Sequence, residues 1–163
     1  MSLDIQSYNM FLSTIEKFVQ KVLIPRESEV IKNNKIPEDI VNEMKKLGIF
    51  GISIPKEFGG SDLSMEQEVK ITFELGKASP AFRSIAGTNI GIGSQTIVMA
   101  GTKEQKQKYL PKFATGEIIG SFALTEPDAG SDAMSIQTKA DKAGNKYVIN
   151  GTKRYITNAP IAN

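Results

Sequence analysis

The densest cluster of side chains that could bind a ligand or take part in a reaction is an eight-residue polar stretch, 125–132, with the sequence TEPDAGSD. It directly follows an apolar run, 118–124, that has the length of a β-strand. One interpretation is a solvated turn shaped by Pro127 and Gly130. The other is a loop at a strand end that presents hydroxyls and backbone N–H groups to anionic or carbonyl oxygens of a ligand. The pattern alone leaves both interpretations open.

A second candidate stretch, 155–158 (YITN), ends another predicted strand. The alternative is an ordinary strand with one face in solvent. If the sheet is antiparallel, the two stretches lie near each other. Four side chains would then surround one flat ligand, with an aromatic ring for stacking and hydroxyls for the ligand's edge: Thr125, Ser131, Tyr155 and Thr157.

Composition narrows the chemistry. The 163 residues include no Cys, His or Trp, and the net charge is +2. Disulfides, thiolate nucleophiles, thiolate metal sites, Ser-His-Asp triads and His-ligated metals are therefore excluded, and we expect no metal site. The small net charge disfavours nucleic acid or an acidic membrane surface as partner. Catalysis would depend on carboxylates, hydroxyls, Lys, Tyr, backbone groups or a bound cofactor.

No stretch approaches the roughly 20 apolar residues that span a bilayer. The first twenty residues fit neither a secretory signal nor an Arg-rich transit peptide. We therefore expect a cytoplasmic protein without a membrane span.

Amphipathic patterns predict helices over the first two thirds of the chain. A long helix is expected over 3–23, with a kink or break at Pro25 and a further helical stretch over 26–33. A second helix has Pro37 at its first position and Gly48 as a left-handed cap after its end. Its predicted buried face consists of Ile40, Val41, Met44 and Leu47. Pro and Gly residues, which interrupt regular secondary structure, predict an irregular loop over 49–63.

Two capping boxes mark further helices. Ser64 with Gln67 begins a helix expected to end at Ser79. A tightly packed helix is predicted over 84–101. Thr102 with Gln105 begins a short helix that Pro111 ends or bends.

The helical period does not return after Gly116. Strands are predicted over 118–124, 137–140 and 146–157, with a turn at 142–145 and a hairpin or bulge at Asn150-Gly151. The expected fold is α+β: an all-α helical domain over 1–117, followed by an incomplete antiparallel β domain over 118–163. Three short strands close neither a barrel nor a sandwich, so a fragment, or a chain whose partner completes the sheet, is expected.

Residues 122–132 (FALTEPDAGSD) resemble the signature segment of acyl-CoA dehydrogenases. Three other segments agree in order and spacing: 54–60 (IPKEFGG), 101–111 (GTKEQKQKYLP) and 150–158 (NGTKRYITN). The resemblance implies an N-terminal helical domain, a middle β-barrel-like domain and a C-terminal four-helix bundle. This sequence would supply the first domain and the beginning of the second.

The resemblance also implies a cofactor and roles for individual residues. Family enzymes use FAD: a Glu removes the α-proton of an acyl-CoA thioester while a β-hydride passes to flavin N5. Phe122, Leu124 and Thr125 would line the flavin, with the backbone and hydroxyl of Thr125 bonding its pyrimidine edge. Gly130 and Ser131 would meet the FAD pyrophosphate, and Ser131 would also bind the substrate's CoA moiety.

The segment Tyr155, Ile156 and Thr157 would pack on the flavin, with the Thr157 hydroxyl near N5. Many relatives have Trp where this chain has Tyr155. An acyl-chain pocket is implied near Gln95 and Val98. The catalytic Glu of the family lies in the C-terminal bundle, beyond residue 163, so no catalytic residue is assigned here, Glu126 included.

The sequence therefore predicts the N-terminal portion of a FAD-dependent acyl-CoA dehydrogenase of fatty acid metabolism, inactive by itself. The implied partners are an acyl-CoA substrate, an electron-transfer protein as acceptor and further copies in a homo-oligomer. Two alternatives stay open. One is a flavin oxidase or monooxygenase on the same scaffold, and the other is a non-catalytic acyl-CoA- or flavin-binding or assembly module.

Overall fold

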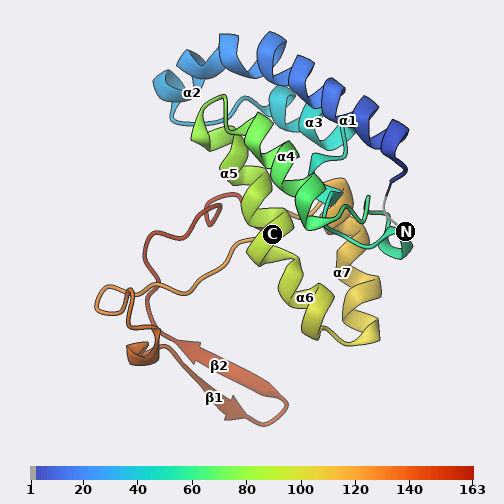
Figure 1. The fold of residues 1–163 in the computed structure, drawn as a ribbon. Helices are drawn as coiled ribbons and strands as arrows, with labels where there is room; N and C mark the ends of the chain where they lie inside the picture. The colour runs from blue at the N-terminus through green and yellow to red at the C-terminus, as the bar shows by residue number, and fades with distance from the viewer. Residues whose placement is uncertain (1–2) are drawn as a thin grey trace.

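The computed structural model describes residues 3–163 and contains a helical part followed by a β-hairpin (Figure 1). The helices are α1 (Ile5–Phe18), α2 (Glu27–Asn33), α3 (Glu38–Lys46), α4 (Met65–Leu75), α5 (Pro80–Thr88), α6 (Gln95–Ala100) and α7 (Lys103–Thr115). The strands are β1 (Lys139–Ala143) and β2 (Lys146–Asn150), paired antiparallel. The predicted fold class, helices followed by a small antiparallel sheet, is confirmed.

Helices α1 and α2 follow one continuous curve across the helical part (Figure 1). Asp4 caps α1 by accepting a hydrogen bond from the Ser7 N–H at 2.9 Å, so the helix begins slightly later than predicted. Between the two helices, a π-helical turn (Val19–Leu23) and a 3-10 turn (Ile24–Arg26) carry the chain past Pro25. The kink or break expected at Pro25 takes the form of altered winding: the α-helix stops at Phe18 and resumes at Glu27, and the turns between them accommodate the missing proline N–H.

The buried face of α3 consists of the residues predicted for it. Ile40 and Met44 are fully buried, and Val41 and Leu47 are half-buried. Pro37 has ψ 137° and lies just outside the helix rather than at its first position. Gly48 has φ +75°, the left-handed conformation predicted for it.

The boundary between α4 and α5 lies elsewhere than predicted. Both hydrogen bonds of the Ser64–Gln67 capping box are present, but α4 ends at Leu75. Ser79 begins the next helix instead, because its side chain accepts from the Ala81 N–H and Pro80 occupies the first helical turn. The segment Asn89–Gly93 then joins α5 to α6 and kinks at Gly91, which has φ −89° and ψ −105°. The single helix predicted over 84–101 is therefore divided between two helices.

Helix α7 begins at the predicted Thr102–Gln105 capping box and runs through Pro111 to Thr115. Pro111 therefore does not end the helix, which was one of the two outcomes predicted for it. Leu110, Phe113 and Ala114 are buried on both sides of the proline, so packing offsets the lost backbone hydrogen bond. No helix within residues 3–163 is long and apolar enough to cross a membrane.

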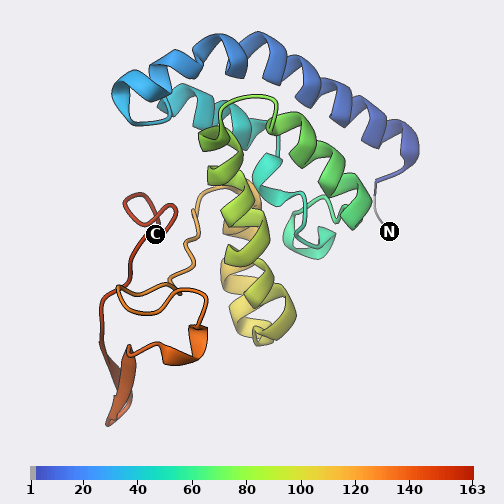
Figure 2. The ribbon, with the colours of Figure 1, turned by 60° about the vertical axis from the view of Figure 1, so that its left-hand side comes forward.

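The main core lies where α1, α3, α4 and α5 meet, and Figure 2 shows α1 and α2 arching over the other helices. The Tyr8 hydroxyl also donates to the Gln67 carbonyl at 3.1 Å, which links α1 to α4. The large side chains that are fully buried in this core are Ile15, Leu23, Ile40, Met44, Ile49, Phe50, Ile52, Ile71, Leu75 and Phe82. This core gives the later part of the chain a rigid support.

The predicted strand over 118–124 does not form. Its Ile119 is buried against the helical core, and the rest is an extended chain without a neighbouring strand. The predicted strand over 146–157 ends at Asn150. The turn predicted over 142–145 is confirmed, because it joins β1 to β2 and contains Gly144 with φ +61°, whereas Asn150-Gly151 forms no hairpin turn. Every residue of both strands is exposed, and the hairpin stands apart from the helices (Figure 2).

Candidate functional site

Two segments, 121–126 and 153–158, lie side by side. The Arg154 N–H donates to the Thr125 carbonyl at 2.8 Å, and the Ser121 hydroxyl donates to the Thr157 carbonyl at 2.8 Å. The juxtaposition expected from an antiparallel sheet is thus produced by individual hydrogen bonds between extended segments. It places Thr125 opposite the segment that carries Tyr155 and Thr157.

Two asparagines attach this pair of segments to the helical core. The Asn89 side chain is buried, and its carbonyl accepts from the Gly120 N–H at 2.6 Å. The Asn158 amide donates to the carbonyls of Ile85 and Gly120 at 3.3 and 3.2 Å. Sequence reasoning included Asn158 only as a member of the candidate stretch 155–158 and missed Asn89, because a buried amide that bridges distant segments has no local sequence signal.

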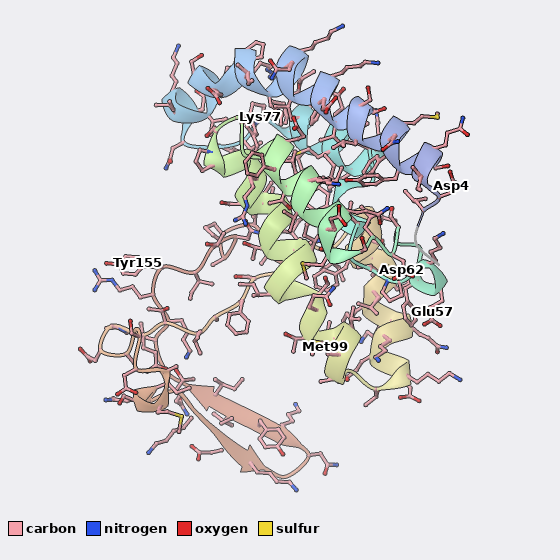
Figure 3. The ribbon with its side chains drawn as sticks, viewed as in Figure 1. Asp4, Glu57, Asp62, Lys77, Met99 and Tyr155 are labelled. Atoms are coloured by element: carbon pink, nitrogen blue, oxygen red, sulfur yellow. The ribbon has the colours of Figure 1, made fainter. Side chains whose placement is uncertain are left out.

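The assembled surface combines apolar groups with hydroxyls. Phe122, Leu124 and Tyr155 are 42%, 37% and 78% exposed. Thr125 and Ile156 are half-buried, and Thr157 is exposed. Figure 3 shows the Tyr155 side chain projecting outward from its segment, away from the helices. An exposed apolar surface next to hydroxyls suits a flat, largely apolar ligand with a polar edge.

Gly130 and Ser131 lie beyond the hydrogen bonds that join the two segments. A backbone bridge between Glu126 and Ala129 closes the turn before them. Gly130 and Ser131 are both exposed. A Cβ built on Gly130 would meet no atom within 4 Å, which leaves room for a ligand group to approach the backbone. Within residues 3–163, the hydroxyls of Thr125, Ser131 and Thr157 have no protein hydrogen-bond partner, so they are available to a ligand.

Tyr155 has an unusual backbone conformation. Its φ is +58°, in the left-handed region that bulky residues rarely adopt. The neighbouring Arg154 guanidinium lies 4.5 Å from the centre of its ring, in cation–π geometry. Backbone strain of this kind persists only where the surroundings enforce it, and it clusters at ligand sites.

Glu126 is buried beneath the polar turn. Its carboxylate accepts hydrogen bonds from the Gln137 N–H at 2.7 Å, from the Thr138 N–H at 2.9 Å and from the Thr138 hydroxyl. It also pairs with the Lys153 ammonium at 2.9 Å. The Lys153 and Thr138 hydrogen bonds lower the pKa of Glu126 to about 2. Its carboxylate is therefore ionised and fully engaged at neutral pH, unlike a general base.

A hollow of about 290 Å³ lies beside the joined segments, between α6, α7 and the chain around Ser121. Its lining is Gly93, Ile97, Tyr109, Phe113, Ile118, Gly120, Ser121 and Asn163. Of the two residues expected near an acyl pocket, Gln95 donates instead to the Ser53 carbonyl at 3.2 Å, and Val98 packs with the small apolar cluster around Leu110. Within residues 3–163 there is no group of acidic side chains that could hold a metal ion.

Two family models match nearly the whole chain. The model of the acyl-CoA dehydrogenase N-terminal domain matches residues 6–117, and the model of the middle domain matches residues 121–163. The chain belongs to the acyl-CoA dehydrogenase family. The resemblance inferred from the four sequence segments is thereby confirmed.

Similar proteins agree with this membership. Mitochondrial isovaleryl-CoA dehydrogenase from Pongo abelii is 38% identical over 151 residues, which are 91% of this chain and 36% of the relative. Acryloyl-CoA reductase (NADH) from Anaerotignum propionicum is 41% identical over 150 residues, 91% of this chain and 38% of the relative. The crystal structure of acyl-CoA dehydrogenase complexed with FAD from Bacillus anthracis matches with a TM-score of 0.86 and 33% identity. That match covers 99% of this chain and 28% of the other. The chain spans less than two fifths of the length of these relatives.

Proposed function

We propose that this chain supplies the flavin-facing part of a FAD-dependent acyl-CoA dehydrogenase, which oxidises the α,β bond of an acyl-CoA thioester. The observation that carries the proposal is the hydrogen-bonded juxtaposition of Thr125 with the segment of Tyr155 and Thr157. Membership of the family and the FAD complex of the Bacillus anthracis relative support FAD as the cofactor. When bound, FAD accepts the hydride that leaves the β-carbon.

The chain's residues fit such a cofactor. Phe122, Leu124, Tyr155 and Ile156 offer the apolar and aromatic contact that a flavin ring needs. We assign the Thr125 N–H and hydroxyl to the pyrimidine edge of the flavin, where negative charge increases on reduction.

Three further assignments complete the site. The exposed Thr157 hydroxyl is assigned to the neighbourhood of flavin N5. Gly130 and Ser131 are assigned to the FAD pyrophosphate, and Ser131 also to the CoA moiety of the substrate. The open space around Gly130 and the unpaired Ser131 hydroxyl support these assignments, because phosphate groups need close backbone approach and donors.

We propose that the proton-abstracting base is not Glu126. A general base works best when its pKa lies near the working pH, whereas the pKa of Glu126 is about 2. Its oxygens also accept four hydrogen bonds. Glu126 therefore has a structural role.

We place the domain boundary between residues 117 and 118. Gly116, with φ +71°, ends α7 in the left-handed conformation, and the helical period ends there. The limits of the two family models lie close to this position and support the proposal.

The resemblance also motivates four finer proposals: an electron-transfer protein as acceptor, a homo-oligomer, a cytoplasmic location and a role in fatty acid metabolism.

The test is a flavin reduction assay on the protein expressed from its complete gene and purified with FAD. Anaerobic addition of a series of acyl-CoA thioesters, isovaleryl-CoA among them, is expected to bleach the flavin absorption and to yield the 2,3-enoyl-CoA. A protein that binds no FAD on reconstitution contradicts the proposal.

A second candidate is reduction of an α,β-unsaturated acyl-CoA, because the reductase from Anaerotignum propionicum is 41% identical to this chain. NADH-dependent consumption of the enoyl-CoA, without oxidation of the saturated thioester, would indicate this activity. Stoichiometric oxygen consumption would instead indicate a flavin oxidase or monooxygenase on the same scaffold.

A further inference from the structure

We propose that Lys153 is a positioning residue that aims the Thr125 N–H at the pyrimidine edge of the flavin, and that Glu126 holds Lys153 in place. This inference rests on the proposed function. It concerns two residues whose side chains are largely buried.

Lys153 bridges two acceptors. Its ammonium donates to the Leu124 carbonyl at 2.8 Å and to the Glu126 carboxylate at 2.9 Å. The side chains of Lys153 and Glu126 are only 21% and 6% exposed, so solvent screens this pair weakly. A charge-assisted hydrogen bond to a backbone carbonyl is stronger than an uncharged one. Lys153 therefore fixes the position of the Leu124 carbonyl.

Fixing that carbonyl also fixes the neighbouring N–H. The carbonyl of Leu124 and the N–H of Thr125 belong to one planar trans peptide unit and point in opposite directions. Lys153 thus directs the Thr125 N–H away from itself. The next peptide unit is held as well, because the Thr125 carbonyl accepts from the Arg154 N–H at 2.8 Å. Residues 153 and 154 together restrain both peptide units that flank Thr125.

The positive charge adds an electronic effect. An ammonium at the carbonyl oxygen polarises the peptide unit, and a polarised peptide has a stronger N–H donor. The donor assigned to the flavin is therefore both directed and strengthened by the same side chain.

Glu126 keeps the ammonium in position. Lys has a flexible four-carbon side chain that does not by itself define where its charge lies. The Glu126 carboxylate is held by the backbone N–H groups of Gln137 and Thr138, just before β1. The location of the Lys153 ammonium is therefore set by Gln137 and Thr138, which follow the polar turn 125–132 in the chain.

This arrangement predicts an effect on the reduction potential. A donor aimed at the pyrimidine edge stabilises the reduced flavin, which carries more negative charge there, more than the oxidised flavin. Loss of the Lys153 bridge is therefore expected to lower the reduction potential of the bound flavin. A purely structural role would change stability and leave the potential of the folded, FAD-saturated protein unchanged.

The experiment uses the double variant Glu126→Gln/Lys153→Met, expressed from the complete gene. Removing both partners avoids an uncompensated buried charge, which the single Lys153→Met change would create. The matched control is Asp128→Asn/Lys142→Met, which neutralises one exposed carboxylate and one exposed lysine. FAD affinity is measured by titration, and the reduction potential is measured at saturating FAD on protein shown to be folded by circular dichroism.

The double variant is expected to bind FAD about tenfold more weakly and to have a lower flavin reduction potential, whereas the control matches the wild type in both. A folded double variant with wild-type affinity and potential overturns the inference. If the double variant does not fold, Glu126→Gln/Lys153→Gln, which removes both charges but keeps polar side chains at both positions, serves instead, and an unchanged potential again overturns the inference. A wild-type protein that binds no FAD contradicts the proposed function rather than this assignment.

Discussion

The buried side-chain carbonyl of Asn89 accepts a hydrogen bond from the backbone N–H of Gly120 at 2.6 Å. This contact joins the end of α5 to the chain that leads into the polar turn. The Asn89 amide also donates to the Phe113 carbonyl of α7 at 3.4 Å. One side chain therefore fixes the helical core to the start of the candidate site.

Replacing Asn89 with Leu, which has a similar volume, is expected to lower the free energy of unfolding by about 1–3 kcal/mol. The Gly120 N–H is buried and would lose its acceptor, so the protein would bear the desolvation cost of an unsatisfied donor. Urea denaturation measures the change. Asn9→Leu on the exposed face of α1 is the control and is expected to stay within about 0.5 kcal/mol of the wild type. Equal effects of the two changes would contradict the role of Asn89.

Gly60 is required by close backbone packing in the loop after α3. A Cβ at this position would lie 1.9 Å from the Ile54 carbonyl oxygen and 2.7 Å from the Gly51 carbonyl oxygen. Backbone atoms do not yield easily, so Gly60→Ala is expected to destabilise the protein by about 1–3 kcal/mol, as overpacking does. Gly130→Ala is the control, because no atom lies within 4 Å of its Cβ position. Chemical denaturation compares the two variants, and a wild-type midpoint for Gly60→Ala would refute this packing.

Local signals explain which helix ends were predicted correctly. The capping boxes at Ser64 and Thr102 and the left-handed Gly48 need only neighbours three or four residues away. The same chemistry is available at Ser79, followed by Pro80, but the sequence prediction ends one helix at Ser79 and begins the next only at residue 84. Pro111 shows the opposite case, because tertiary packing of α7 outweighs a local breaking signal.

Long-range contacts explain what the sequence did not predict. The run over 118–124 has strand composition, yet Ile119 packs on the helical core and Gly120 bonds to Asn89. The convergence of Thr125 with Tyr155 is what an antiparallel sheet predicts, because one residue follows a predicted strand and the other lies at the end of another. The bridge from Lys153 to Glu126 was not, because a pair separated by 27 residues leaves no periodic signal. The sequence thus predicted the residues of the exposed candidate surface better than the residues that hold them in place.

Glu126 should make stability depend on pH in the acidic range. Its pKa is about 2 in the folded protein, against an ordinary value of 4.5. A carboxyl with a lowered pKa contributes stability that is fully present above about pH 4.5 and is lost as the pH falls towards 2. The free energy of unfolding of the wild type should therefore fall more steeply over this window than that of Glu126→Gln.

Urea denaturation at several pH values measures both slopes. The pKa values of Glu29 and Asp39 are also lowered, by hydrogen bonds from Arg26, but they contribute equally to both proteins. Asp128→Asn, in the same turn, should keep the wild-type slope. Identical slopes for the wild type and Glu126→Gln would show that the Glu126 hydrogen bonds do not stabilise the fold.

Tyr155 offers a test that separates stability from ligand binding. Its left-handed backbone costs about 1–2 kcal/mol, which glycine avoids, while glycine loses about 0.5–1 kcal/mol more conformational free energy on folding. Tyr155→Gly should therefore leave the free energy of unfolding within about 1 kcal/mol of the wild type. If the 78% exposed ring packs on the flavin as proposed, the same variant should bind FAD about tenfold more weakly.

Tyr155→Trp is the matched variant, because it keeps an aromatic ring at the same backbone position. It should bind FAD at least as tightly as the wild type, since the larger indole offers more stacking area. FAD titration and urea denaturation on all three proteins give both quantities. If Tyr155→Gly binds FAD with wild-type affinity, the Tyr155 ring does not contact the flavin. A large loss of stability would show instead that the side chain enforces the left-handed conformation through packing.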